Sequence, residues 1–130
     1  MLENLVSFKD FEVAASKNLS KAAYDYYRAG ANGSVSLRDN EEAFTKMYIK
    51  TSLFGKRGPV SLNSTIMGHK VNSPIAIAST AFHRMAHPDG ELATARAANA
   101  FNGTTLKLSS WSTTTLEEVA AQAPDSLKFF

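Results

Sequence analysis

Three short apolar segments alternate with two helical segments along the second half of the chain, and this alternation limits the possible folds most. The apolar segments span residues 74–80, 104–110 and 126–130, and the helical ones span 91–101 and 116–123. In the first apolar segment, PIAIAST, apolar residues occupy both faces, as in a parallel strand covered on both sides. The order strand, helix, strand, helix, strand predicts two right-handed crossover units of a parallel sheet, and therefore an α/β fold.

Capping signals predict where these two helices begin and end. Pro88 suits the first turn of the first helix, and Glu91 lies near its positive end. The pair Asn102–Gly103 predicts the end of that helix. Thr114 with Glu117 predicts a capping box for the second helix.

The first half of the chain carries helix signals without strands between them. Ser7 followed by Asp10 predicts a capped helix start, and Ser20 opens a second helix, KAAYDYYRAG. Ser36 and Asp39 predict the start of a third helix after the loop ANGSVS. We therefore expect a helical segment in front of the sheet.

A change of pattern near residue 74 divides the chain into two parts. Residues 1–73 are expected to form the helical segment with a short hairpin around Met67–Gly68, and residues 74–130 the β/α part. The last residues, DSLKFF, are an apolar strand without a polar tail, whereas chain termini usually lie at the surface. We therefore expect the chain to stop in mid-fold.

Composition and charge argue against several classes of protein. Hydrophobic residues make up 44% and charged residues 20% of the chain, which is typical of a globular domain. The net charge is +2 and no basic run is long, so nucleic-acid binding has no electrostatic support. There is no cysteine, no signal-peptide core, and no apolar stretch near the roughly 20 residues of a membrane helix. The histidines, which we expect to be structural or exposed, have no metal-site spacing; they are His69, His83 and His87.

Small and hydroxyl residues follow the first two predicted strands. Thr80 and Ala81 end the first strand, and Ser109 to Trp111 end the second. Because ligands gather at the carboxyl ends of parallel strands, these residues could hold a flat ligand at one rim of the sheet. The alternative is that serine and threonine only begin loops and cap helices, and spacing alone favours that alternative.

Three motifs taken together favour the ligand-binding interpretation over the capping one. They are YDYYRAGA at residues 24–31, AHPDGELATARAA at 86–98 and LSSWSTTTLEEVA at 108–120. In this order and spacing they resemble the FMN-dependent α-hydroxy-acid oxidase family, which includes glycolate oxidase and lactate oxidase. The resemblance covers the whole chain and matches the N-terminal third or so of the family's domain.

The resemblance implies a TIM (β/α)8 barrel behind an N-terminal helical segment. The chain then holds an incomplete barrel, with the helical segment, the first three strands and two helices. Residues 74–130 become the start of the FMN-binding barrel, which stops after the third strand. A complete barrel needs about 250 residues.

The same resemblance implies an activity. The parent enzyme oxidises a small (S)-2-hydroxy acid, such as glycolate, lactate or a longer acid, to the 2-oxo acid, with FMN as cofactor and oxygen as acceptor. It implies no nucleic-acid or membrane partner, a homo-oligomer for an intact parent, and a peroxisomal location in eukaryotes or otherwise a cytoplasmic one. The isolated chain is expected to be inactive.

Four residues are implied as flavin contacts. In the family a Pro-Thr-Ala turn and a Leu-Ser-Ser-Trp turn touch the flavin. Thr80 and Ala81 would lie against the isoalloxazine through their backbone, and Ser109 would hydrogen-bond the ring. Ser79 replaces the proline of the first turn, which softens the turn but keeps its hydrogen-bonding groups.

Two further residues are implied as substrate contacts. The Tyr26 hydroxyl would bind the substrate carboxylate, and Trp111 would line the pocket. The alternative for both is packing, because aromatic residues on a short helix or after a strand usually belong to a core. The family's catalytic histidine, arginines and lysine come from later strands, so we assign no catalytic residue and no metal ligand to this chain.

Lys107 departs from the expected pattern. It alternates with Ser109 along the second strand, so it would face the barrel interior, where an unpaired ammonium is costly. Either an acid from another strand pairs with it, or the strand register differs, or the chain has drifted from function. Two other functions stay open. One is a non-catalytic truncated product or relic, and the other is a part of another FMN-dependent TIM-barrel enzyme, against which the YDYYRAGA and LSSW elements argue.

Overall fold

The computed structural model describes residues 5–51, 55 and 58–130. The chain divides into two compact units, Met1–Arg57 and Gly58–Phe130, and each is described by itself. The sequence-based division at residue 73 follows the change from a helical to a β/α pattern, and it stays a prediction.

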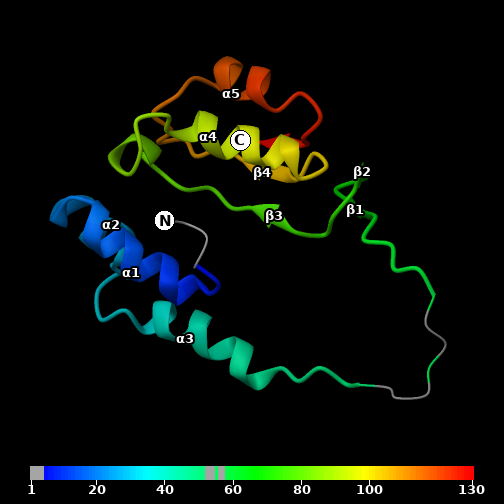
Figure 1. Cartoon of the computed structure of the whole chain (residues 1–130), viewed down its shortest axis with the longest axis horizontal. Helices are drawn as coiled ribbons and strands as arrows, with labels where there is room; N and C mark the ends of the chain where they lie inside the picture. The colour runs from blue at the N-terminus through cyan, green and yellow to red at the C-terminus, as the bar shows by residue number, and fades with distance from the viewer. Residues whose placement is uncertain (1–4, 52–54, 56–57) are drawn as a thin grey trace. The chain divides into compact units, whose positions relative to one another are not determined.

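The described residues of the N-terminal unit form three α-helices, as predicted. They are α1 (Phe8–Asn18), α2 (Lys21–Arg28) and α3 (Val35–Ala43), and α3 continues into a short 3-10 helix, η1 (Phe44–Lys46). Figure 1 shows them in blue and cyan. Few of their residues are buried: of the described residues in this unit, only Ala23 is fully enclosed, at 1% exposed. The bounds of these helices are therefore set largely by capping groups at their ends.

Two of the three predicted helix starts are confirmed. The Ser7 hydroxyl accepts from the Asp10 backbone N–H at 3.3 Å, and the Asp10 carboxylate accepts from the Ser7 N–H at 2.8 Å. The Ser20 hydroxyl caps α2 by accepting from the Ala23 N–H. The predicted start of α3 at Ser36 is wrong, because Ser34, in the left-handed conformation with φ 55°, directly precedes the first helical residue.

The C-terminal unit begins with the predicted hairpin. Strands β1 (Ser64–Ile66) and β2 (His69–Val71) pair antiparallel, with Ile66 opposite His69. The two turn residues have positive φ, 48° at Met67 and 85° at Gly68. Two consecutive positive φ angles give the twist that suits a two-residue hairpin.

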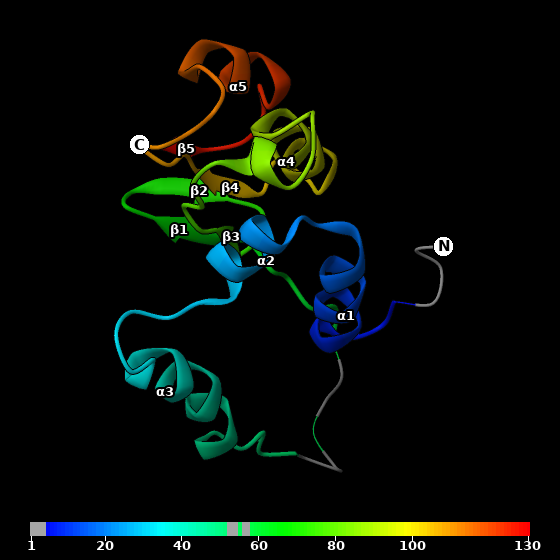
Figure 2. The same ribbon diagram turned by 90° about the vertical axis from the view of Figure 1, so that its left-hand side faces the viewer.

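The predicted parallel sheet follows the hairpin. Strands β3 (Ala76–Ile77), β4 (Thr105–Lys107) and β5 (Lys128–Phe129) lie in the order β3-β4-β5, all parallel. Helices α4 (Glu91–Ala100) and α5 (Leu116–Gln122) make the two crossovers. They lie on the same face of the sheet (Figure 2).

The core of this unit fills the space between α4, α5 and the sheet. It consists of Ala95, Ala98, Leu106, Val119 and Ala123, with Ile77, Leu92 and Leu108 packed against it. The alanines let α4 and α5 approach the strands closely, so a short sheet suffices to bury them. Ile75, just before β3, is 71% exposed, so the expected burial of the first strand on both faces stays a prediction.

Glycines fix the two ends of α4. Gly90, the N-cap, has φ 54°, and an added Cβ would meet Arg84 Cγ at 2.7 Å. The predicted first-turn position of Pro88 is therefore wrong, because Pro88 lies in the turn before Gly90 and the helix begins at Glu91. The predicted end at Asn102–Gly103 is confirmed, with both residues at positive φ.

The capping box of α5 lies one residue later than predicted. Thr115 and Glu118 form it, with both reciprocal hydrogen bonds present, instead of Thr114 and Glu117. The physical reason is that the Thr114 hydroxyl already donates to the Glu91 carboxylate at 2.8 Å. A long-range hydrogen bond therefore decides which of three consecutive threonines caps the helix.

Candidate functional site

The carboxyl ends of β3 and β4 meet at one edge of the sheet, as their parallel order requires. The Phe82 backbone N–H, after β3, donates to the Trp111 carbonyl, after β4, at 3.0 Å. The rings of Phe82 and Trp111 stack, with centroids 5.8 Å apart and planes inclined by 19°. The two segments that follow the strands therefore form one continuous surface.

The structure brings two of the predicted flavin-binding residues to one small cavity at this edge. Its lining includes Thr80, Ser109, His83, Glu91 and Lys107. The cavity has a volume of about 10 Å³, room for at most one water molecule. A ligand would therefore lie over this edge and would not enter it.

The predicted flavin contacts have small side chains and are accessible. Ser79 and Thr80 are exposed, and Ala81 and Ser109 are half-buried. The Ser109 hydroxyl accepts from the Trp111 backbone N–H at 3.1 Å, which leaves its proton available to a ligand acceptor. Exposed backbone beside a free hydroxyl proton fits the edge of a flat, polar ring such as an isoalloxazine.

The two predicted substrate contacts lie in different units. Trp111 is 63% exposed and its ring stacks on that of Phe82, so both its predicted substrate contact and the packing alternative stay open. Tyr26 lies on α2 in the N-terminal unit, is 43% exposed, and packs edge to face on Tyr27 at 5.3 Å. The proximity of Tyr26 to the strand ends stays a prediction.

A buried carboxylate that the sequence placed only near a helix start, with no part in a site, lies behind this edge. Glu91, the first residue of α4, is 2% exposed. Its Oε1 accepts from the backbone N–H groups of His83 at 3.1 Å and Thr113 at 2.9 Å. Its Oε2 accepts from the hydroxyls of Thr113 at 2.6 Å and Thr114 at 2.8 Å. Four donors thus converge on one side chain.

These donors keep Glu91 ionised. Burial raises its pKa, but the hydrogen bonds from Thr113 and Thr114 outweigh burial and hold the pKa at about 2. The start of a helix also favours a negative charge. The only sequence signals are an acid at the helix start and the threonine run 113–115. Their separation of 22 residues hides the pairing in a single sequence.

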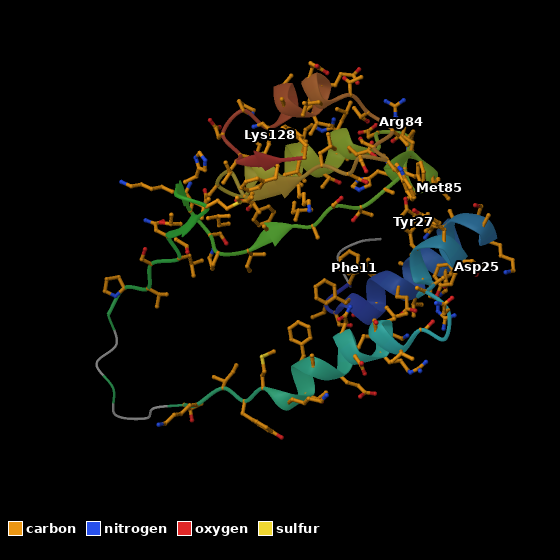
Figure 3. The ribbon with its side chains drawn as sticks, turned by 180° about the vertical axis from the view of Figure 1, so that it is seen from behind. Phe11, Asp25, Tyr27, Arg84, Met85 and Lys128 are labelled. Carbon is orange, nitrogen blue, oxygen red and sulfur yellow. The ribbon has the colours of Figure 1, made fainter. Side chains whose placement is uncertain are left out.

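His83 and His87 take part in local hydrogen bonds, and His69 is exposed on β2. His83, on the 3-10 helix η2 (His83–Met85), is half-buried, with Nδ1 at 3.2 Å from the Thr94 hydroxyl. Figure 3 labels Arg84 and Met85 on the same turn. His87 accepts from the Asp89 backbone N–H in the turn before α4. No group of acidic, histidine or cysteine side chains suited to a metal occurs among the described residues.

Lys107 is exposed in this unit, and its expected burial in the interior of a complete barrel stays a prediction. Its neighbours Leu106 and Leu108 pack towards α4 and α5, which places Lys107 on the opposite face of β4 together with Ser109. The predicted alternation is therefore confirmed.

Comparison with known proteins assigns the chain to the same kind of family that the three sequence motifs resemble. A profile of the FMN-dependent dehydrogenase family matches residues 15–130. 2-Hydroxyacid oxidase 1 of Homo sapiens is 41% identical over 129 residues, which are 99% of this chain and 35% of that protein. Glycolate oxidase 1 of Zea mays is 40% identical over 97% of this chain and 34% of its own length. The chain thus spans about a third of the length of these relatives.

Solved structures agree in fold. The flavin-binding domain of baker's yeast flavocytochrome b2 matches with a TM-score of 0.89 and 27% identity, over 98% of this chain and 33% of that one. A mandelate oxidase variant with (S)-mandelic acid matches with a TM-score of 0.87 and 31% identity, over 98% and 37%. The predicted incomplete TIM barrel is confirmed. The chain belongs to the FMN-dependent dehydrogenase family, whose cofactor is FMN.

Proposed function

We propose that this chain forms the first part of an FMN-dependent (S)-2-hydroxy-acid oxidase. The enzyme would convert a small 2-hydroxy acid, such as glycolate, lactate or a longer acid, to the 2-oxo acid, and oxygen would be the final acceptor. The observation that supports this most is the edge where β3 and β4 end, with accessible small and hydroxyl residues, in a chain of this family. The named relatives are oxidases of 2-hydroxy acids.

The residues at this edge would hold the isoalloxazine of FMN. The backbone of Ser79, Thr80 and Ala81 would lie along the ring, and Ser109 would donate its hydroxyl proton to a ring acceptor. When bound, FMN supplies a two-electron acceptor for the oxidation of the alcohol. We assign no phosphate-binding group to this chain.

Tyr26 and Trp111 would bind the substrate. A phenol hydroxyl can donate to a carboxylate, and hydrogen bonds to charged groups are stronger than neutral ones. The exposed Trp111 indole would limit the pocket beside the strand ends. The chemistry also needs a base and cations for the substrate, which we place outside this chain.

The partner of the protein would be a small-molecule acid, and the intact parent would be a homo-oligomer. A peroxisomal location would apply to a eukaryotic protein, and a cytoplasmic one otherwise. In the part of the chain that the structure describes, no helix has the length and apolar character needed to cross a membrane.

The test uses the protein that carries this sequence, expressed at its natural length. FMN is titrated while flavin fluorescence is followed, and peroxide release is measured with glycolate and lactate. We expect FMN binding and substrate-dependent peroxide, and Ser109→Ala should weaken FMN binding while the matched surface change Ser16→Ala should not. A folded protein without FMN affinity would overturn the proposal.

A further inference from the structure

The Glu91 carboxylate joins two segments that are distant in sequence and adjacent at the candidate flavin edge. Oε1 accepts one backbone N–H from each segment, from His83 after β3 and from Thr113 after β4. Flavin-contact candidates precede these bonds in both segments, Thr80 in one and Ser109 in the other. The spacing of these two residues therefore depends on the segments that Glu91 connects.

A second layer of hydrogen bonds strengthens the connection. The Thr113 hydroxyl accepts from the Arg84 backbone N–H at 3.3 Å and donates to Glu91 Oε2 at 2.6 Å. The Phe82 N–H donates to the Trp111 carbonyl at 3.0 Å. Several successive hydrogen-bonded connections therefore join residues 82–84 to residues 111–113. Two of these connections run through the Glu91 carboxylate.

The surroundings of Glu91 are closely packed next to Gly90, and its carboxylate is saturated with hydrogen bonds. Gly90 is buried, and a Cβ there would come within 3.3 Å of the Thr113 hydroxyl. Each Glu91 oxygen accepts two hydrogen bonds, which is the full capacity of a carboxylate. In a Glu91→Gln variant the side-chain amide keeps one acceptor oxygen. Its NH2 group is a donor, however, and it would face the two threonine hydroxyls, which donate to the carboxylate in the wild type.

We propose that Glu91 is a positioning residue for the flavin site, and that its carboxylate sets the spacing between the segments carrying Thr80 and Ser109. The inference rests on the proposed function, because the ligand is FMN. Glu91 does not touch the flavin. It acts through the backbone of His83 and Thr113, which fixes where the two strand-end turns lie before the ring binds.

The experiment compares Glu91→Gln with Glu118→Gln in the protein of natural length. Glu118 makes the same carboxylate–threonine contact at a helix start, but it is exposed and bonds only within its own capping box. Three quantities are measured: hydrogen exchange of the Phe82 and Thr113 amides, the Kd for FMN, and the absorption spectrum of bound FMN. We expect Glu91→Gln to speed both exchanges, raise the Kd roughly tenfold and alter the spectrum, and Glu118→Gln to change none of them.

A second pair of variants keeps the inference testable if the Glu91→Gln protein does not fold. Thr113→Val removes the hydroxyl that links Arg84 to Glu91, whereas Thr113→Ser keeps it. Thr113→Val should raise the Kd for FMN several-fold, and Thr113→Ser should restore the wild-type Kd and spectrum.

The outcomes separate this inference from the proposed function. If the wild-type protein binds FMN but the Glu91→Gln and Thr113→Val variants that fold keep its Kd and spectrum, the carboxylate is only structural and the inference is wrong. A folded wild-type protein that binds no FMN would overturn the proposed function and the flavin part of this inference. Exchange at Phe82 and Thr113 would then still show whether Glu91 holds the two segments together.

Discussion

Helices α1 and α2 of the N-terminal unit meet through exposed charged groups, whereas α4 and α5 of the C-terminal unit meet over a buried apolar core. Glu12 on α1 lies 3.4 Å from the Tyr24 hydroxyl and 3.5 Å from Arg28, both on α2, and it also pairs with Lys9 of its own helix at 2.8 Å. In the C-terminal unit, Val119 is 1% exposed and is the largest fully buried side chain. The same kind of helix pair is therefore stabilised in two ways.

The two carboxylates show the difference most clearly. Glu12 is solvated, so its ion pairs gain little over the water they replace. Glu91 is 2% exposed, and four hydrogen bonds replace its hydration. Loss of the Glu91 carboxylate leaves these buried donors without an acceptor, which is costly. We therefore expect the C-terminal unit to respond strongly to single changes and the N-terminal unit weakly.

The largest effect is expected when residues 1–130 are produced alone. Large apolar side chains are exposed in both units, including Phe8 at 96%, Ile49 at 93% and Ile75 at 71%. Strands β3 and β5 also leave unpaired edges, which favour association. We expect this chain to aggregate and to bind FMN at most weakly, as followed by light scattering and flavin fluorescence. A soluble monomer with micromolar affinity would show that the two units suffice for the site.

Acid should weaken the C-terminal unit through Glu91. Its pKa is about 2 in the folded protein and 4.5 ordinarily, so its contribution is complete above pH 4.5 and falls as the pH drops towards 2. The full contribution is about 3 kcal/mol, of which about 2 kcal/mol is lost by about pH 3. Urea unfolding of the wild type between about pH 6 and pH 3 should show this loss. Glu91→Gln should remove that part of the pH dependence, and an unchanged dependence would contradict the assignment.

Truncation of the core should destabilise the C-terminal unit next. Val119→Ala removes two methyl groups from the contact between α5 and the sheet, and we expect a loss of about 2.5 kcal/mol of unfolding free energy. The matched change is Val13→Ala on α1, where the side chain is 46% exposed and alanine favours the helix. Chemical denaturation should find that second change close to neutral. Equal losses at the two valines would remove the contrast between the units.

Tyr26 tests whether the N-terminal unit contributes to the site. If its hydroxyl binds the substrate carboxylate, Tyr26→Phe in the full-length enzyme should cost roughly 2 kcal/mol of substrate binding, or roughly 30-fold in KM. FMN affinity should change little. The control is Tyr48→Phe, since Tyr48 is 91% exposed. Unchanged kinetics for Tyr26→Phe would remove this residue from the site.

Local signals predicted most of the elements, and long-range contacts account for the errors. Ser7, Ser20 and the Met67–Gly68 turn act through neighbours within a few residues, so the sequence alone locates them. Thr114 was predicted to cap α5, but its hydroxyl bonds Glu91, which lies 23 residues away. The same separation is why the sequence alone did not show that Glu91 accepts hydrogen bonds from the threonine run. A single sequence shows which groups can hydrogen-bond, and the fold decides which of them do.

The family motifs predict a flavin contact at this edge, whereas the sequence pattern alone favoured capping, and the flavin contact stays a prediction. Spacing favoured capping roles for the residues after the strands, and Ser109 does accept from the Trp111 backbone N–H. The parallel order of β3 and β4, which the pattern predicted, is what brings Thr80 and Ser109 to the same cavity. The place of Tyr26 could not be derived in this way, because no sequence signal relates α2 to the sheet.

The smallest effect is expected for Glu12→Gln, the counterpart of Glu91→Gln in the N-terminal unit. The hydrogen bond from Lys9 lowers the pKa of Glu12, but both side chains are exposed, 38% for Glu12 and 76% for Lys9. Water can solvate the lysine when the charge of its partner is removed, so the urea midpoint should barely move. The small change that does occur should vanish in high salt, since salt screens exposed pairs. If Glu12→Gln destabilised the protein as much as Glu91→Gln, the carboxylates would not differ in the way that their burial predicts.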